Sequence, residues 1–316
     1  MFGSHLSIAG AMVNALDEAA KLKLDTVQVF TKNQQQWKAK PLNPGMVQSW
    51  IARVAELGWQ GRTVSHASYL INLASPDDVL WHKSIDLMAD EIGRCQALGI
   101  PFLVHHPGAF TTSTRELGLA RIALAYRELF SRSRGSTVVS CLENTVGSGS
   151  NLGRGFDEIA TLRDLILSET STPDRLGICF DTCHAHAGGY DLSTAASANA
   201  ALNLFDQTVG LGWIRVLHLN DSKGALGSKL DRHEHIGKGT IGDAGFKVVV
   251  NRPEFASIPK ILETPKGESD GGEPLDAINL RRLCSFRSLG PIKQPKSGSR
   301  GATVSTRQRP RTTGRP

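Results

Sequence analysis

The most constraining feature of the sequence is a regular alternation of short apolar runs with segments of helical periodicity. Eight runs rich in apolar and β-branched residues predict strands, at 2–8, 26–31, 63–69, 102–106, 138–144, 176–182, 216–220 and 260–263. Helical patterns follow them, at 10–22, 44–57, 77–98, 115–130, 156–167, 193–208, 243–250 and 275–283. Strands that alternate with helices are parallel, so eight such units predict an α/β fold, the (β/α)8 or TIM barrel. A doubly wound open sheet is the alternative.

The charge of the chain is unevenly distributed along its length. The formal net charge of the 316 residues is +6, but residues 281–316 contain ten Lys or Arg and no Asp or Glu. Residues 1–280 therefore hold 26 basic and 30 acidic residues. From about residue 285 Pro, Gly, Ser, Thr and Arg dominate, a composition that cannot bury an apolar core. We expect a barrel domain over 1–285 and a disordered basic tail over 286–316.

Several classes of protein are excluded or disfavoured. The first residues lack the features of a signal peptide, and no apolar run approaches the roughly 20 residues of a membrane span. The five cysteines are scattered, which favours a reducing, cytoplasmic location. Cys179 and Cys183 are metal ligands or, as we favour, buried thiols. The first predicted strand is not followed by a dinucleotide-binding glycine pattern, and the glycines of 147–153 indicate a tight turn.

Six consecutive predicted strands, the third to the eighth, end in residues that bind metals. These residues are His66, His105 with His106, Glu143, Asp181 with His184, His218 and Glu263. In a barrel the carboxyl ends of all strands meet at one rim, which is where such folds place their chemistry. Converging carboxylates and imidazoles would repel or shift their pKa values strongly, and a cation removes the problem. Mixed nitrogen and oxygen ligands suit zinc or manganese better than calcium.

Two further residues extend this set. Asp231 and His233 lie two apart after the seventh strand, a spacing that lets both side chains point to one ion in extended backbone. With only His106 counted from the adjacent pair His105 and His106, the candidate ligands number nine. Nine are too many for one zinc ion, which takes about four, and are enough for a cluster of two or three. A metal cluster at a barrel rim indicates hydrolysis of a phosphodiester.

The flanks of these residues carry a specific resemblance. The chain resembles the endonuclease IV family of apurinic/apyrimidinic (AP) endonucleases over residues 2 to about 283. The motifs that carry it are Phe2-Gly-Ser-His-Leu-Ser, Phe30-Thr-Lys-Asn-Gln, Trp37, His66-Ala-Ser-Tyr-Leu-Ile-Asn-Leu, His106-Pro-Gly, Glu143-Asn-Thr, Gly149-Ser-Asn-Leu-Gly, Asp181-Thr-Cys-His-Ala, Gly189-Tyr-Asp-Leu, His218-Leu-Asn-Asp, Asp231-Arg-His, Gly237-Lys-Gly and Ile261-Leu-Glu-Thr.

The resemblance implies a TIM barrel with three zinc ions and a role in base-excision DNA repair. The first ion would take His66, His106 and Glu143. The second would share Glu143 and take Asp181, His218 and Glu263. The third would take His184, Asp231 and His233.

The implied reaction cleaves the phosphodiester 5′ to an abasic site in duplex DNA, leaving a 3′-hydroxyl and a 5′-deoxyribose phosphate. It includes repair of blocked 3′ ends. Glu143 and Glu263 would be the catalytic carboxylates. Tyr69 and Leu70 stand at the family's DNA-wedge positions, and Gln35 stands where many members carry arginine, so we expect weaker DNA binding. We expect a monomer with no membrane partner.

Two other functions compete with this one. A sugar isomerase or epimerase would use a rim metal site with only one or two ions. A DNA-binding module would act through the basic tail alone, without catalysis.

Overall fold

The computed structural model describes residues 1–288, and eight parallel strands in it close into a barrel. Around the barrel the order is β1, β10, β7, β6, β5, β4, β3, β2. Closure comes from the pairing of the first strand with the last, in which Phe2 faces Lys260 and Ser4 faces Leu262. The predicted (β/α)8 barrel is confirmed, and the open doubly wound sheet is excluded. The strands are β1 Phe2–His5, β2 Thr26–Val29, β3 Val64–His66, β4 Phe102–His105, β5 Val139–Glu143, β6 Leu176–Asp181, β7 Ile214–His218 and β10 Lys260–Leu262.

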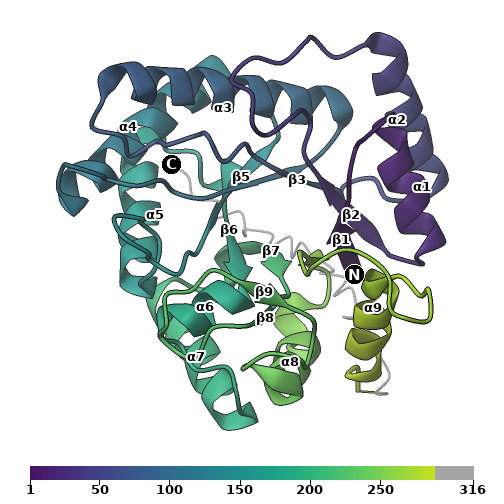
Figure 1. The fold of residues 1–316 in the computed structure, drawn as a ribbon. Coiled ribbons are helices and arrows are strands. Elements are labelled where there is room, and N and C mark those ends of the chain that lie inside the picture. The colour runs from purple at the N-terminus through teal and green to yellow at the C-terminus, as the bar shows by residue number, and fades with distance from the viewer. Residues whose placement is uncertain (289–316) are drawn as a thin grey trace, which may run out of the picture.

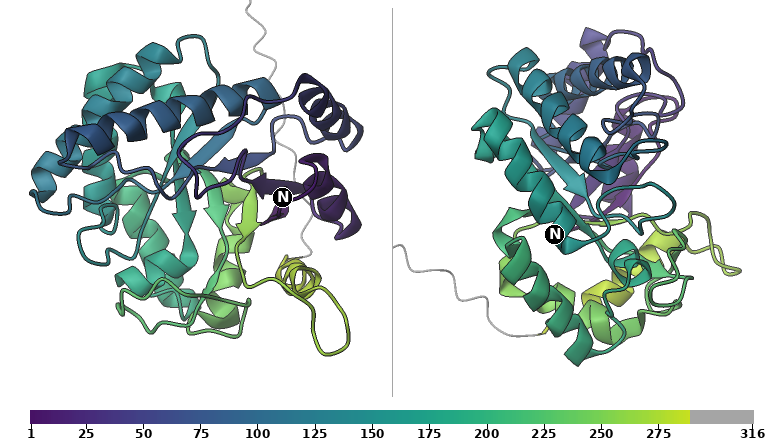
Figure 2. Two further views of the ribbon diagram at one scale, coloured as in Figure 1. Left: turned by 45° about the horizontal axis from the view of Figure 1, so that its top comes forward. Right: turned by 90° about the vertical axis from the view of Figure 1, so that its left-hand side faces the viewer.

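Helices surround the strands, as Figure 1 and the two views of Figure 2 show. Side-chain caps define several of their first turns: Asn43, Asp77 and Thr114 each accept backbone N–H groups, which the start of a helix leaves without partners. The helices are α1 Val13–Lys21, α2 Pro44–Glu56, α3 Asp78–Leu98, α4 Arg115–Arg132, α5 Phe156–Thr170, α6 Thr182–Gly188, α7 Ala195–Thr208, α8 Gly242–Asn251 and α9 Leu275–Ser285. Among residues 1–288, no helix is long and apolar enough to cross a membrane.

Two apolar regions hold the barrel together. The larger one lies between the strands and the helices and includes Trp50, Tyr126 and Phe205, all fully buried. The smaller one is a set of six buried side chains from six different strands, namely Val64, Val104, Cys141, Cys179, Val216 and Ile261. Side chains that pack together from many strands of a barrel fill its interior. This inner layer is the floor on which the candidate site is built.

Short elements that the sequence did not predict lie near the same rim. They are helix α6 and a two-stranded antiparallel sheet formed by β8 Asp221–Ser222 and β9 His233–Glu234. The sheet lies beside α6 in Figure 1. Three 3-10 turns, at Pro173–Arg175, Leu211–Trp213 and Pro253–Phe255, were also not predicted. Most of the expected basic tail, residues 289–316, lies outside the described part of the chain.

Candidate metal centre

Six of the nine predicted ligands stand two residues after a side chain of the inner apolar layer. His66 follows Val64, and Glu143 follows Cys141. The same spacing relates the layer to His106, Asp181, His218 and Glu263. Residues two apart in a strand point to the same face, so all six side chains enter the barrel mouth from its carboxyl-terminal end. His105, one residue out of phase, turns the other way and hydrogen-bonds Tyr126 and Ser140.

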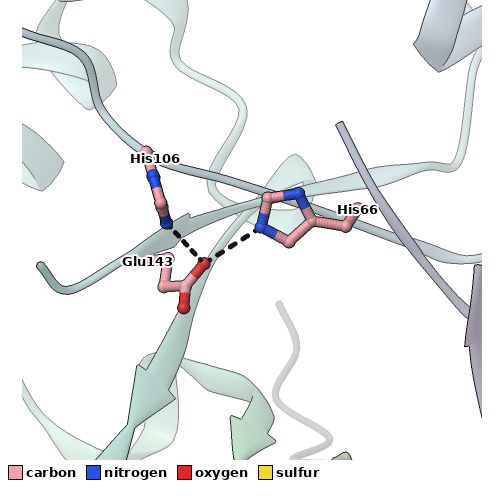
Figure 3. A group of neighbouring side chains, drawn as sticks. All are labelled: His66, His106 and Glu143. Atoms are coloured by element: carbon pink, nitrogen blue, oxygen red, sulfur yellow. Dashed lines mark hydrogen bonds and ion pairs between the residues drawn. The ribbon is translucent and has the colours of Figure 1, made fainter. Parts of the chain in front are cut away.

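Glu143 lies at the centre of the site and is 1% exposed. Its Oε2 lies 3.2 Å from His66 Nε2 and 3.4 Å from His106 Nε2. Figure 3 shows both rings pointing at this oxygen. Its Oε1 lies 2.9 Å from His218 Nδ1 and 3.3 Å from His184 Nδ1. One buried carboxylate therefore faces two separate pairs of imidazoles, which is the arrangement expected of a bridging ligand.

The second group surrounds His218, which is fully buried. Glu263 Oε2 lies 3.1 Å from His218 Nδ1, and Asp181 Oδ2 lies 3.8 Å from the same nitrogen. The ligand atoms of Glu143, Asp181, His218 and Glu263 all lie within 4.8 Å of one another. The four residues that the family resemblance assigns to one ion therefore cluster around a common point.

The third group is more open. Asp231 Oδ1 lies 3.2 Å from His184 Nε2 and 3.6 Å from His233 Nε2, and the Asp231 side chain is 48% exposed. Asp181 Oδ2 lies 3.9 Å from His233 Nε2, so Asp181 adjoins both the second and the third group. Asp181 also caps helix α6 by accepting the His184 N–H at 2.7 Å, which fixes the two residues relative to each other.

The positions of the ligand atoms in the third group fit a bound metal ion. Nε2 of His184 and Nε2 of His233 are buried without a hydrogen-bond partner, although a carboxylate oxygen lies close to each. Orphaned buried nitrogens are costly unless something else engages them. Two ligands of a tetrahedral zinc ion, each at about 2.0–2.1 Å from it, lie roughly 3.3 Å apart. The separations within the third group are close to that value.

The electrostatics of the site require positive charge. Burial alone would raise the pKa of Glu143, but His218 and His106 outweigh it and lower that pKa well below its usual range. Burial likewise opposes charge on His184, yet Asp181 and Asp231 raise the pKa of His184 well above its usual range. Protons on the imidazoles or bound cations can both supply this positive charge.

Polar residues outside the predicted set also contact the site. Gln28 is fully buried on β2, and its amide nitrogen donates to Glu263 Oε1 at 2.6 Å. The Gln28 Oε1 atom lies 2.9 Å from His218 Nε2. His5, the last residue of β1, lies 3.3 Å from Glu263 Oε1 through its Nδ1. Both carry a signal in the sequence, since Gln28 interrupts an apolar strand and His5 ends a strand at the same rim.

Burial disfavours the thiolate form of the two cysteines near the site. Cys179 lies beside Glu143 and His218, and Cys183 is the second residue of α6. Both are buried, and burial raises the pKa of each thiol to about 12. A protonated thiol is a poor metal ligand.

The predicted DNA-contact residues lie on two hydrogen-bonded loops, and one of them, Tyr69, lies beside the cluster. Tyr69 is 59% exposed, and its ring centroid lies 5.2 Å from that of His66. Leu70 is half-buried next to it, and Gln35 is exposed on the loop that follows β2.

Known proteins share this architecture. A family model described as "Xylose isomerase-like TIM barrel" matches residues 16–283. A probable endonuclease 4 of Chloroflexus aggregans is 43% identical over 282 residues, 89% of this chain and 97% of the relative. One of Geobacter sp. (strain M21) is 41% identical over 286 residues, 90% of this chain and 98% of the relative.

Solved structures agree with the sequence relatives. The crystal structure of endonuclease IV from Thermus thermophilus is 35% identical, with a TM-score of 0.77 over 90% of this chain and 98% of that one. A D-tagatose 3-epimerase-like protein, 18% identical with a TM-score of 0.67 over 90% of this chain and 96% of that one, shares the fold alone. The extent and level of identity to the endonuclease relatives decide the question of ancestry: this chain belongs to the endonuclease IV family.

Proposed function

We propose that the chain is a zinc-dependent AP endonuclease of base-excision repair. It hydrolyses the phosphodiester 5′ to an abasic site in duplex DNA and leaves a 3′-hydroxyl and a 5′-deoxyribose phosphate. The observation that carries the proposal is the position of Glu143, whose two oxygens face separate histidine pairs at the centre of nine clustered ligands. Family membership supports the choice of DNA as the substrate.

Three ions would be held by three sets of side chains, and Glu143 would belong to two of them. The sets are His66, His106 and Glu143; Glu143, Asp181, His218 and Glu263; and His184, Asp231 and His233. When bound, such ions lower the pKa of a water and neutralise charge on phosphoryl oxygens.

Glu263 and Glu143 would be the catalytic carboxylates. Glu263 is held at both oxygens, because Gln28 donates to Oε1 and His218 lies 3.1 Å from Oε2. A carboxylate fixed in this way can orient an attacking water without having to reorganise during the reaction. The lowered pKa of Glu263, which burial opposes and His218 enforces, keeps it ionised as such a role requires.

Tyr69, Leu70 and Gln35 would contact the DNA. Tyr69 and Leu70 would fill the gap left when the abasic nucleotide leaves the helix stack, which offsets the cost of unstacking. Gln35 would make an uncharged contact. The same site would trim blocked 3′ ends, and the enzyme would work as a cytoplasmic monomer.

The test is incision of a duplex that contains one tetrahydrofuran abasic analogue by the zinc-loaded full-length chain. We expect a nick 5′ to the analogue, with a 3′ end that a polymerase extends. Glu263→Gln should lower the rate by about 10²–10⁴-fold, the usual contribution of a positioned acid or base. Glu254→Gln is the matched control, because Glu254 is exposed just before the opposite end of the same strand, β10.

An intact abasic duplex in the presence of a chain with three bound zinc ions would contradict the proposal. Interconversion of ketose epimers by that chain would instead favour the epimerase alternative.

A further inference from the structure

A buried cluster of polar side chains links the two loops that carry the predicted DNA contacts. It consists of Glu91 on helix α3, Lys32 shortly after β2, and Ser68 after β3. None of the three is among the nine candidate ligands. The Lys32 and Glu91 side chains are 3% and 1% exposed.

Glu91 connects the first loop to the second. Its Oε1 accepts the Ser68 N–H at 2.9 Å and lies 3.9 Å from Lys32 Nζ. Lys32 Nζ in turn donates to the carbonyl oxygens of Asn33 at 3.0 Å and Gln36 at 2.6 Å. The ammonium group therefore holds both ends of the short loop on which Gln35 lies.

Ser68 joins the loops directly. Its hydroxyl donates to the Gln34 carbonyl at 2.5 Å and accepts the Leu70 N–H at 3.3 Å. Residues 33–36 and residues 68–70 thus share one hydrogen-bonded network, which we name the loop clasp: Lys32, Ser68 and Glu91. Tyr69 and Gln35 lie on its two sides and are both exposed.

Stability alone does not account for a buried carboxyl group and a buried amine at this place. Burial raises the pKa of Glu91 to about 7 and lowers the pKa of Lys32, so the fold disfavours charge on both groups. Removing two charges from water costs several kcal/mol per ion, and well-packed apolar residues are often as stable. The best-attested use of such a pair is to fix the register of the segments that it joins. Here those segments are the two loops that carry every predicted DNA-contact side chain.

We propose that Glu91 is a positioning residue for DNA binding, which holds residues 33–36 and 68–70 as a single surface aimed at the abasic site. This inference rests on the proposed function. It assigns to Glu91 an effect on substrate binding, exerted through Tyr69, Leu70 and Gln35, and no part in holding metal.

The experiment is a double-mutant cycle between Glu91→Gln and Tyr69→Ala in the zinc-loaded full-length chain. Glu91→Gln should lower kcat/KM for abasic duplex by about tenfold or more, because small misplacements of substrate-contacting groups have effects of that order. The loss should fall mainly on KM, with zinc content unchanged. In the Tyr69→Ala background the same change should lower kcat/KM by a smaller factor than it does in the wild-type chain, since residues that act together are not additive.

The matched control is Asp86→Asn, which removes an exposed carboxylate from the same helix and should behave as wild type. Ser68→Ala is a second test, needed where Glu91→Gln does not fold. It removes the direct link to Gln34 and should also raise KM non-additively with Tyr69→Ala.

Additive effects in both cycles, or zinc lost in proportion to activity, would overturn the inference while leaving the proposed function intact. A wild-type chain that holds zinc but leaves abasic duplex uncut would contradict the proposed function, and the inference with it.

Discussion

At the scale of single residues, Gln28 hydrogen-bonds two candidate ligands at once and shows how far the site depends on its neighbours. Gln28→Met keeps the volume of the side chain but leaves Glu263 Oε1 with His5 alone and removes the partner of His218 Nε2. Loss of such outer contacts typically weakens metal binding by about 10–100-fold. We expect zinc affinity, measured by competition with a chelator, to fall by this factor, and excess zinc to restore part of the incision rate.

Gln48→Met is the control, since Gln48 lies on the outer helix α2, away from the metal ligands. Unchanged zinc affinity in the Gln28→Met chain would show that Glu263 and His218 hold their positions without it.

The residues that sequence reasoning finds and misses differ in one physical respect. His66, Glu143 and Asp181 can be found because each ends an apolar strand, and the neighbouring strands also end in residues of metal-binding types. His5 occupies the same position on β1, but a single histidine is more often packed or solvated than functional, so it does not stand out. Gln28 contacts the site from within a strand, and only the closed barrel brings its side chain to Glu263, across the intervening strand β1.

At the scale of elements, the third group of ligands depends on short pieces of structure. His184 is on the seven-residue helix α6, and His233 begins the two-residue strand β9. Elements of this length carry too few residues to show a periodic pattern, which is why the sequence did not predict them. The eight barrel strands were predicted because helices separate them at regular intervals.

Asp221 fixes the small sheet of β8 and β9, and β9 carries the candidate ligand His233. Asp221 is fully buried, and its carboxylate accepts four backbone N–H groups, from Ser222 at 2.8 Å, Gly237 at 2.9 Å, Ile241 at 3.0 Å and Gly242 at 3.3 Å. Asp221→Asn keeps the shape but turns an amide donor toward those donors, a mismatch that costs about 1–3 kcal/mol.

We expect Asp221→Asn to loosen this sheet and to release the ion proposed for the third group of ligands. Zinc content should fall from three toward two per chain, and incision should fall with it. Asp270→Asn, on an exposed loop, should retain three. A full complement of zinc bound at wild-type affinity by Asp221→Asn would count against this role.

At the scale of the whole molecule, positive charge that would attract DNA has two sources under the proposed function. Residues 1–288 carry 29 basic and 30 acidic side chains, so the described body has a formal net charge of −1. Three divalent ions would add six positive charges, all at the rim where the candidate ligands converge. Residues 289–316 add seven Lys or Arg and no acidic residue. Attraction at the rim is local, whereas attraction by the terminal segment is independent of DNA sequence and of damage.

A chain that ends at Ser288 separates the two sources. The cut belongs there because Phe286 is buried and the Arg287 guanidinium lies 4.4 Å from the centre of the Phe2 ring, so both residues are part of the packed body. We expect the shortened chain to incise abasic duplex at low salt within about twofold of wild type, since every candidate ligand and DNA-contact residue remains.

The affinity of the shortened chain for undamaged duplex should fall, and the plot of log K against log salt should become shallower by about 0.9 for each phosphate that the segment neutralises in the full-length chain. Fluorescence anisotropy over a series of salt concentrations measures that slope. Loss of incision at saturating enzyme would mean that the basic segment takes part in the catalytic complex, whereas an unchanged slope would mean that it does not touch DNA at all.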